Sequence, residues 1–243
     1  MAETSTASSR VLHGATDQRF YTWVAVGVAL IVFAGFAQTY YLKAFFGTPP
    51  LSLLFHIHGL LMTAWFVLFF VQVRLVAAHR TDLHRRLGVA GAVLAGLIVV
   101  IAPGVALTSG RHHLATDPNS DALIFLPVPL VIVLLFSIFI AAAILLRRRP
   151  AYHKRLMVLA CLSIIPAGID RLPLHFIENA GRWTLFGLND LCLIACMIYD
   201  TLRNRRLHPA WVWGSLLLVG SQPLIMLVRE TPAWLRVAAW LLK

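Results

Sequence analysis

Two histidines occupy equivalent positions in two similar stretches of sequence. Residues 82–88 read DLHRRLG and residues 151–157 read AYHKRLM, so in each stretch a histidine is followed by two basic residues and a leucine. Each stretch begins an apolar segment, and the repeat is either a true duplication or a convergence on one loop pattern. If the two segments pack together, the imidazoles of His84 and His153 could face each other and supply both axial nitrogens of a b-type haem.

Polar residues near these histidines suit the other groups of a haem. Arg85, Arg86 and Arg155 can donate charge-assisted hydrogen bonds to propionates,. Gln72 lies one turn before the end of the preceding apolar segment, where it could bond to either histidine. Basic residues at a membrane surface also contact lipid headgroups, and that alternative requires no cofactor.

A second group of histidines and acids falls near the opposite ends of the apolar segments. In an extended segment His56 and His58 would lie on one side, and His58 with His175 and Asp170 could then bind zinc or copper,. In a helix, residues two apart point about 200° apart, so only one of the pair could face the protein interior. An outer metal site is therefore an alternative to the haem.

Ionisable residues within an apolar segment form the third candidate site. Asp170 and Arg171 fall inside one such segment and Asp190 inside the next. A charged side chain in a membrane is costly and is normally paired, and sequence neighbours do not face each other on a helix. We therefore predict an Arg171–Asp190 contact with His58 or His175 nearby. It is either an interhelical clamp or part of a pocket for a proton, a metal or a small ligand.

The overall composition identifies the kind of element that must carry these residues. Of 243 residues, 59% are hydrophobic and 13% are charged, and the mean hydropathy is +0.79. A soluble domain has about 25% charged residues. This difference excludes an ordinary soluble protein and a disordered chain. The three cysteines, Cys161, Cys192 and Cys196, lie within apolar segments, so we expect no disulfide framework,.

The fold predicted from this pattern is an all-α polytopic membrane bundle of seven transmembrane helices, each about 20 residues long. The spans are 20–41, 51–73, 87–108, 122–146, 156–177, 184–201 and 210–228. Residues 1–19 form a polar segment, 20–230 the transmembrane domain and 231–243 an interfacial tail. Spans two to five make two hairpins of one orientation, which could pack as a four-helix core.

The distribution of basic residues predicts the orientation. If the N-terminus is cytoplasmic, 14 of the 21 lysines and arginines lie in inside segments and 7 in outside segments. The positive-inside rule then places the N-terminus inside and the C-terminus outside in a bacterial inner membrane. The net charge of +11 thus reflects topology. We expect the lipid bilayer, and a second copy or another membrane protein, as partners, and no nucleic acid.

Several of these motifs resemble a family of uncharacterised bacterial integral membrane proteins. The shared pattern covers roughly residues 52–175 and consists of His58-Gly59, Gln72, Arg74, His84 to Gly88, His153 to Met157 and Arg171. The resemblance implies a membrane protein with no established reaction. The layout of histidines on four helices is also similar to that of transmembrane b-type cytochromes, which implies bis-histidine haem and electron transfer by analogy of fold.

Three functions remain open from the sequence. The first is electron transfer or redox sensing by a b-type haem at His84 and His153. The second is binding of a metal or small ligand by the outer residues, in a transporter element or a membrane hydrolase. The third is a structural or assembly role without a cofactor. The sequence has no phosphate-binding glycine loop, no Gly-x-Ser-x-Gly and no His-Glu-x-x-His, so it does not decide whether the protein is an enzyme.

Overall fold

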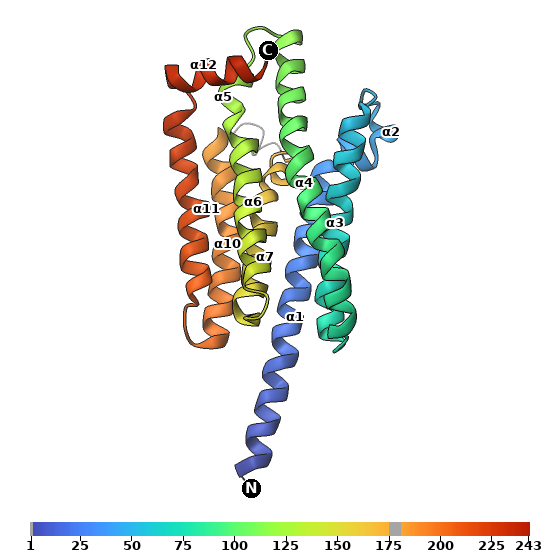
Figure 1. Ribbon diagram of the computed structural model, residues 1–243, viewed down its shortest axis with the longest axis vertical. Coiled ribbons are helices and arrows are strands. Elements are labelled where there is room, and N and C mark those ends of the chain that lie inside the picture. The colour runs from blue at the N-terminus through green and yellow to red at the C-terminus, as the bar shows by residue number, and fades with distance from the viewer. Residues whose placement is uncertain (1, 175–180) are drawn as a thin grey trace.

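The computed structural model describes residues 2–174 and 181–243, which form helices and turns without a strand among them. The elements are α1 (Ala2–Phe36), the π-helical turn η1 (Ala37–Tyr41), α2 (Lys43–Phe46), α3 (Leu53–Ala77), α4 (Thr81–Thr116), α5 (Ala122–Phe125), α6 (Pro127–Leu145), α7 (Pro150–Ile164), α8 (Pro166–Ile169), α10 (Gly181–Asn204), α11 (Pro209–Val228) and α12 (Pro232–Leu241). The long helices run along one axis (Figure 1). We call the end with turns 78–80, 146–149 and 205–208 the basic end, and the other the α12 end.

Helix starts follow simple local rules. Proline is the first residue of α6, α7, α8, α11 and α12, where its fixed φ suits the helix and its missing N–H would have no partner anyway. Two helices also have side-chain caps: His208 accepts the backbone N–H of Ala210, and Thr231 accepts that of Trp234,. These starts fix where the chain turns at each end of the bundle.

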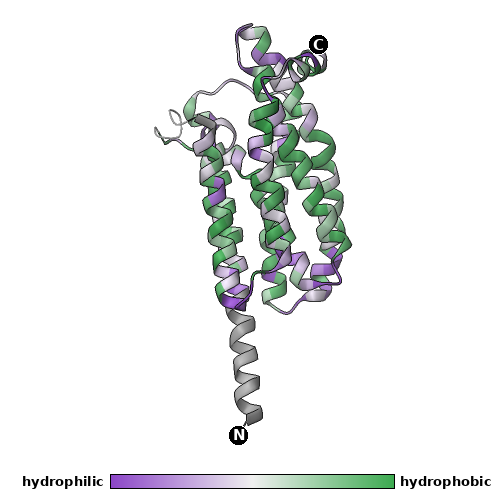
Figure 2. Cartoon of the chain, turned by 90° about the vertical axis from the view of Figure 1, so that its left-hand side faces the viewer, coloured by the Kyte–Doolittle hydropathy of each residue, from purple (hydrophilic) through white to green (hydrophobic). Residues whose placement is uncertain are grey.

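Six helices in the described part of the chain are long and apolar enough to cross a membrane. They are Gln18–Tyr41, Leu53–Ala77, Thr81–Thr116, Ala122–Leu145, Trp183–Asn204 and Pro209–Val228. Each overlaps one of the seven predicted spans. Hydrophobic residues prevail along the middle of the helices, whereas hydrophilic ones gather at the turns (Figure 2). The protein is therefore an all-helical bundle whose apolar surface suits a lipid bilayer.

The fifth predicted span, 156–177, does not form one uninterrupted helix. Helix α7 ends at Ile164, and α8 covers only Pro166–Ile169. The physical reason is Pro166, which lacks the amide hydrogen that would continue the helical hydrogen bonding. The prediction of a single helix over residues 156–177 is therefore wrong.

The interrupted helix α7 is the most enclosed element of the bundle. All residues from Val158 to Ile164 are buried, because α7 packs against α6, α10, α11 and α1. The two predicted hairpins, α3–α4 and α6–α7, are present and pack together through α4 and α6. The core nevertheless extends beyond spans two to five, since residues of α1, α10 and α11 belong to the same buried cluster.

A close crossing holds α8 against α1. A Cβ atom added to Gly35 would overlap the backbone of Gly168. Only glycine lets the two backbones approach this closely, as at small-residue contacts between membrane helices. The crossing positions the end of α8 beside Phe36.

The C-terminal tail forms a helix that lies across one end of the bundle (Figure 1). In this helix, α12, the indole N–H of Trp234 donates to the carbonyl of Leu123 over 2.9 Å. Arg111 of α4 donates to the carbonyl of Leu241 over 3.1 Å. Ala238 and Leu242 are buried, whereas Trp240 is 71% exposed. This orientation suits the predicted interfacial position of residues 231–243.

Candidate cofactor site at the basic end

The two repeated histidines lie side by side at the basic end of the bundle. His84 is the fourth residue of α4 and His153 the fourth residue of α7, so equivalent positions on two helices face each other. Their ring centroids are 6.3 Å apart, and the ring planes are nearly perpendicular at 83°. Both side chains are partly buried. The structure therefore brings together the two imidazoles that the sequence repeat singled out.

Hydrogen bonding fixes the tautomer of one ring. Nδ1 of His153 lies 2.8 Å from the carbonyl oxygen of Ala143. A carbonyl only accepts, so Nδ1 carries the hydrogen and donates, and Nε2 keeps a free lone pair when the ring is neutral. Nδ1 of His84 is buried and has no hydrogen-bond partner among the described residues. Nδ1 of His84 and Nε2 of His153 thus make no hydrogen bond to the residues that the structure describes.

Gln72 supports the backbone beneath His84. Its Nε2 donates to the backbone carbonyl oxygen of His84 over 3.2 Å and not to either imidazole. A Cβ on Gly88 would lie 3.7 Å from the same nitrogen, so the amide packs beside the glycine. The first turns of α4 are therefore held on α3 by a side chain, next to the imidazole pair.

The separation of the two ring centroids is close to that of two imidazoles that would ligate one metal ion. Metal–nitrogen bonds of about 2 Å place the centroids of two opposed imidazoles about 6 Å apart, and the observed value is 6.3 Å. Imidazole ligands commonly donate their second N–H to a backbone carbonyl, which fixes the ring. His153 has this partner in Ala143. The geometry and the hydrogen bonding thus both suit a bis-histidine centre.

Of the three arginines predicted to hold propionates, two are exposed at the surface and one is buried. Arg85 and Arg86 are exposed next to His84. Arg155 is 3% exposed and makes two hydrogen bonds to the carboxylate of Asp200, at 2.8 and 2.9 Å. Because its guanidinium is committed to that buried carboxylate, the prediction that Arg155 pairs with a propionate is wrong.

Asp200 is the centre of a buried polar cluster that the sequence reading missed. Besides Arg155, it accepts a hydrogen bond from Nε1 of Trp211 at 2.9 Å and one from Nδ2 of Asn204 at 3.2 Å. We call Arg155, Asp200, Asn204 and Trp211 the Asp200 cluster. It joins α7, α10 and α11. An acidic residue in the last turns of a predicted span was the available signal, since such a residue normally has a buried cation as partner.

His208 connects this cluster to the start of α7. Its ring packs edge-on against Tyr152, with centroids 4.5 Å apart, and its Nδ1 accepts the N–H of Ala210 over 3.1 Å. Burial, and secondly the positive charge of Arg155, lower the pKa of His208 below its ordinary value,. The neutral ring is the form that can cap α11, because a doubly protonated ring accepts no hydrogen bond.

The predicted ion pair between Arg171 and Asp190 is wrong. Arg171 donates to the carbonyl of Ala167 over 2.8 Å and lies over the ring of Phe36, 4.9 Å from its centroid. Asp190 accepts a 2.7 Å hydrogen bond from Gln222. Arg171 follows the end of α8 at Ile169, and there its guanidinium lies against α1 and not against α10.

The predicted outer metal ligands are only partly described. His58 is partly buried on α3 within electrostatic range of Arg171, and its neighbour His56 is exposed, as helical spacing requires. Asp170 is exposed, and His175 lies outside the described residues. Within residues 2–174 and 181–243, no three His, Cys, Asp or Glu side chains form a group that could hold a metal ion. A zinc or copper site that includes His175 stays a prediction.

Comparisons of this chain with family models, curated proteins and solved structures gave no match.

Proposed function

We propose that this protein binds a b-type haem between His84 and His153 and uses it to transfer electrons or to sense redox state. The observation that carries the proposal is the imidazole pair, with ring centroids 6.3 Å apart and one ring fixed through its Nδ1 by a backbone carbonyl. The layout similarity to transmembrane b-type cytochromes favours the same function by analogy of fold, whereas the motif resemblance to an uncharacterised membrane family implies no reaction.

Each nearby residue has a defined task in this proposal. His84 and His153 would hold the haem iron through their imidazole nitrogens, and the carbonyl of Ala143 fixes the ring of His153. Gln72 fixes the backbone of His84. The guanidinium groups of Arg85 and Arg86 are exposed and can each bind a propionate,. When bound, the haem supplies a one-electron couple. With two histidines as ligands, the iron would have no position left for oxygen, which favours electron transfer.

We also propose the seven-span topology with the N-terminus inside a bacterial inner membrane. Residues 150–169 of α7 and α8 would extend about 30 Å at 1.5 Å per residue, enough to cross the hydrocarbon region. Because other helices enclose α7, this segment can cross the membrane with few side chains facing lipid. This arrangement places the basic end, and with it the histidine pair, on the cytoplasmic side.

Optical spectroscopy of the purified full-length protein tests the haem. We expect protein from haem-supplemented cells to show a Soret band that shifts on reduction. His84→Ala and His153→Ala should each lose most of the band. His112→Ala is the matched control, because His112 is an exposed histidine on the far end of α4, and it should keep the full band. A colourless wild-type protein, or an unchanged band in the double variant of the pair, would refute the proposal.

A second candidate function is ligand or metal binding near His58. The observation that favours it is a buried Nδ1 on His58 without a hydrogen-bond partner among the described residues, within range of the charge on Arg171. Metal analysis of purified wild-type protein and of His58→Ala separates this site from the first. Metal that disappears in His58→Ala but persists in His84→Ala supports the outer site.

A further inference from the structure

A groove of about 800 Å³ runs between α10 and α11. Small-molecule sites in proteins commonly have volumes of about 300–1,000 Å³ and a mainly apolar lining with a few polar groups. The groove has this composition, because apolar residues such as Trp183 and Leu216 form most of its lining. Its polar side chains are Asp190, Ser215 and Gln222. Trp183 and Leu216 are exposed, so the groove opens on the outer surface of the bundle, where a lipophilic molecule can enter from the bilayer.

Two glycines widen the groove, one on each helix. Gly187 of α10 and Gly220 of α11 both line it. A Cβ atom added to either glycine would lie more than 4 Å from any neighbouring helix. A larger residue at these positions would therefore project into the open space of the groove without a clash.

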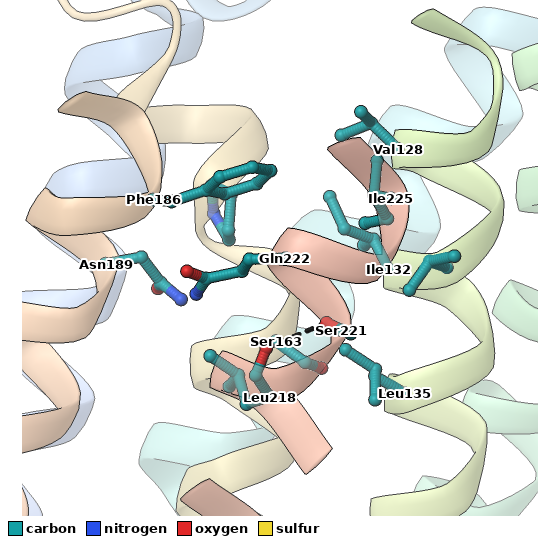
Figure 3. A pocket seen from close by; sticks show the side chains of 12 residues that line it. Val128, Ile132, Leu135, Ser163, Phe186, Asn189, Leu218, Ser221, Gln222 and Ile225 are labelled. Atoms are coloured by element: carbon teal, nitrogen blue, oxygen red, sulfur yellow. Dashed lines mark hydrogen bonds between the residues drawn. The ribbon is translucent and has the colours of Figure 1, made fainter. Parts of the chain in front are cut away.

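The smaller pocket drawn in Figure 3 is too small for such a molecule. It lies between α6, the α7–α8 break, α10 and α11, and its volume is about 20 Å³. That is room for one water molecule at most. Phe186 and Gln222 line both the pocket and the groove, so they lie between the two spaces. A lipophilic ligand would therefore occupy the groove alone.

A polar pair lies in the apolar groove. Gln222 extends from α11 towards α10, where Phe186 and Asn189 are found (Figure 3), and it donates to Asp190 Oδ1 over 2.7 Å. This bond uses one hydrogen of the Gln222 amide and one oxygen of Asp190. The second N–H and the second carboxyl oxygen can each form another hydrogen bond. Acidic residues within membrane spans mark functional sites by default, and this pair can anchor the polar group of a ligand.

The depth of Asp190 decides the kind of occupant. Asp190 is about 10 Å along the helix axis from Trp183, the nearer end of the span Trp183–Asn204,. A phospholipid would place its headgroup at the end of the span, and only its hydrocarbon chains would pass the polar pair. Hydrocarbon offers no hydrogen bond to a polar group. The pair therefore suits a molecule that carries an uncharged polar group inside the hydrocarbon region.

We infer that the groove between α10 and α11 binds an uncharged lipophilic alcohol from the membrane. Its hydroxyl group lies at Asp190 and Gln222, and its hydrocarbon part lies against the apolar lining. A hydroxyl both donates and accepts, so it can bond to the carboxyl oxygen and to the amide N–H at once. The inference is independent of the haem, because His84 and His153 lie on α4 and α7 and do not line the groove.

Thermal unfolding of the full-length, delipidated protein in detergent tests the site. Farnesol, an isoprenoid alcohol, is compared with farnesene, a hydrocarbon of the same chain, at equal mole fractions in the micelle. Farnesol should raise Tm saturably, by about 3–6 °C at ten times its Kd, and farnesene should raise it much less. An unchanged Tm with farnesol would overturn the proposal. An equal rise with farnesene would also overturn it, since any lipid chain would then fill the groove.

Variants that fill the groove locate the alcohol. Gly187→Leu and Gly220→Leu each place a side chain in open space, so both should fold and lose most of the rise of Tm with farnesol. Gly96→Leu is the matched control, because Gly96 of α4 also has open space at its Cβ position but does not line the groove. A full response to farnesol in the double variant Gly187→Leu/Gly220→Leu would overturn the proposal. A wild-type dimer in detergent that Gly220→Leu dissociates would mean that a second copy occupies the groove, with the same consequence.

The double variant Asp190→Leu/Gln222→Leu tests the polar pair. It removes both partners of one hydrogen bond together, which costs less stability than leaving one of them unpaired. Farnesol and farnesene should then raise Tm equally. A preference for farnesol that persists in this variant would show that the hydroxyl group binds elsewhere, and it would refute the assignment to Asp190 and Gln222.

Discussion

Helix α10 carries two carboxylates ten residues apart, and their surroundings are opposite. Asp200 is 1% exposed and accepts hydrogen bonds from Arg155, Trp211 and Asn204. Asp190 is partly buried and accepts a hydrogen bond from the neutral amide of Gln222. The charge of Asp200 is therefore balanced within the protein, whereas the charge of Asp190 is not balanced by any described side chain.

The difference separates a structural charge from one that can bind. A buried ion pair whose hydrogen bonds are all made holds helices in one arrangement and has little capacity for a further ligand. The Asp200 cluster does this for α7, α10 and α11. A carboxylate whose partner is a neutral amide keeps the capacity to bind a further group. The basic end is thus the rigid part of α10, and the Asp190 region is the part available for binding.

The largest expected effect is the difference in Tm between Asp200→Ala and Asp190→Ala. Asp200→Ala leaves the guanidinium of Arg155 buried without its counterion, which costs about 3–5 kcal/mol. In a chain of this size, the loss corresponds to a Tm decrease of about 6–20 °C. Asp190→Ala should change Tm much less, because the partner that it leaves behind, the amide of Gln222, carries no charge.

Thermal unfolding followed by tryptophan fluorescence provides the measurement for both aspartates. Equal losses of Tm in the two variants would contradict the distinction between them. The double variant Arg155→Leu/Asp200→Leu sharpens it. This change removes both charges together and should recover much of the lost stability, which a catalytic or ion-binding role for Asp200 would not predict.

A smaller effect is expected when one donor of the Asp200 cluster is removed. Trp211→Phe deletes the Nε1 hydrogen bond to a charged acceptor, which is worth about 1.5–3 kcal/mol. The matched control is Trp213→Phe, two residues along the same helix, where the side chain is 68% exposed. That change should stay within about 0.5 kcal/mol. Similar unfolding midpoints for the two variants in a denaturant titration would show that the indole does not stabilise Asp200.

The sequence predicted the general architecture well because apolar length is a direct physical requirement of a membrane. Six spans agree with helices that are long enough to cross, and the repeat around His84 and His153 predicted two rings that are neighbours in space. Both results depend on local pattern. Neither needs knowledge of how helices rotate against one another.

The pairing of charges could not be predicted in the same way. Arg171 and Asp190 are at similar depth in the predicted spans, but depth does not say which way a side chain points. The guanidinium of Arg171 bonds to the carbonyl of Ala167 and lies over the ring of Phe36, a neighbour on α1 that its depth in the span did not indicate. Arg155 was assigned to a cofactor because its true partner, Asp200, is 45 residues away. Such pairs are determined by helix packing, which a single sequence does not show.

The smallest expected effect concerns pH at the edge of the Asp200 cluster. The pKa of His208 is lowered in the folded protein by burial and by Arg155. Below the ordinary histidine value of about 6.5, the unfolded chain therefore binds more protons than the folded one, and stability decreases as pH falls towards the folded pKa. One proton limits the slope of the unfolding free energy to about 1.4 kcal/mol per pH unit.

His208→Asn keeps a side chain that can cap α11 but does not titrate. Unfolding midpoints measured between pH 7.5 and 5.5 should fall more steeply for wild type than for His208→Asn, and parallel curves would mean that the imidazole does not couple protons to the packing of α7 and α11.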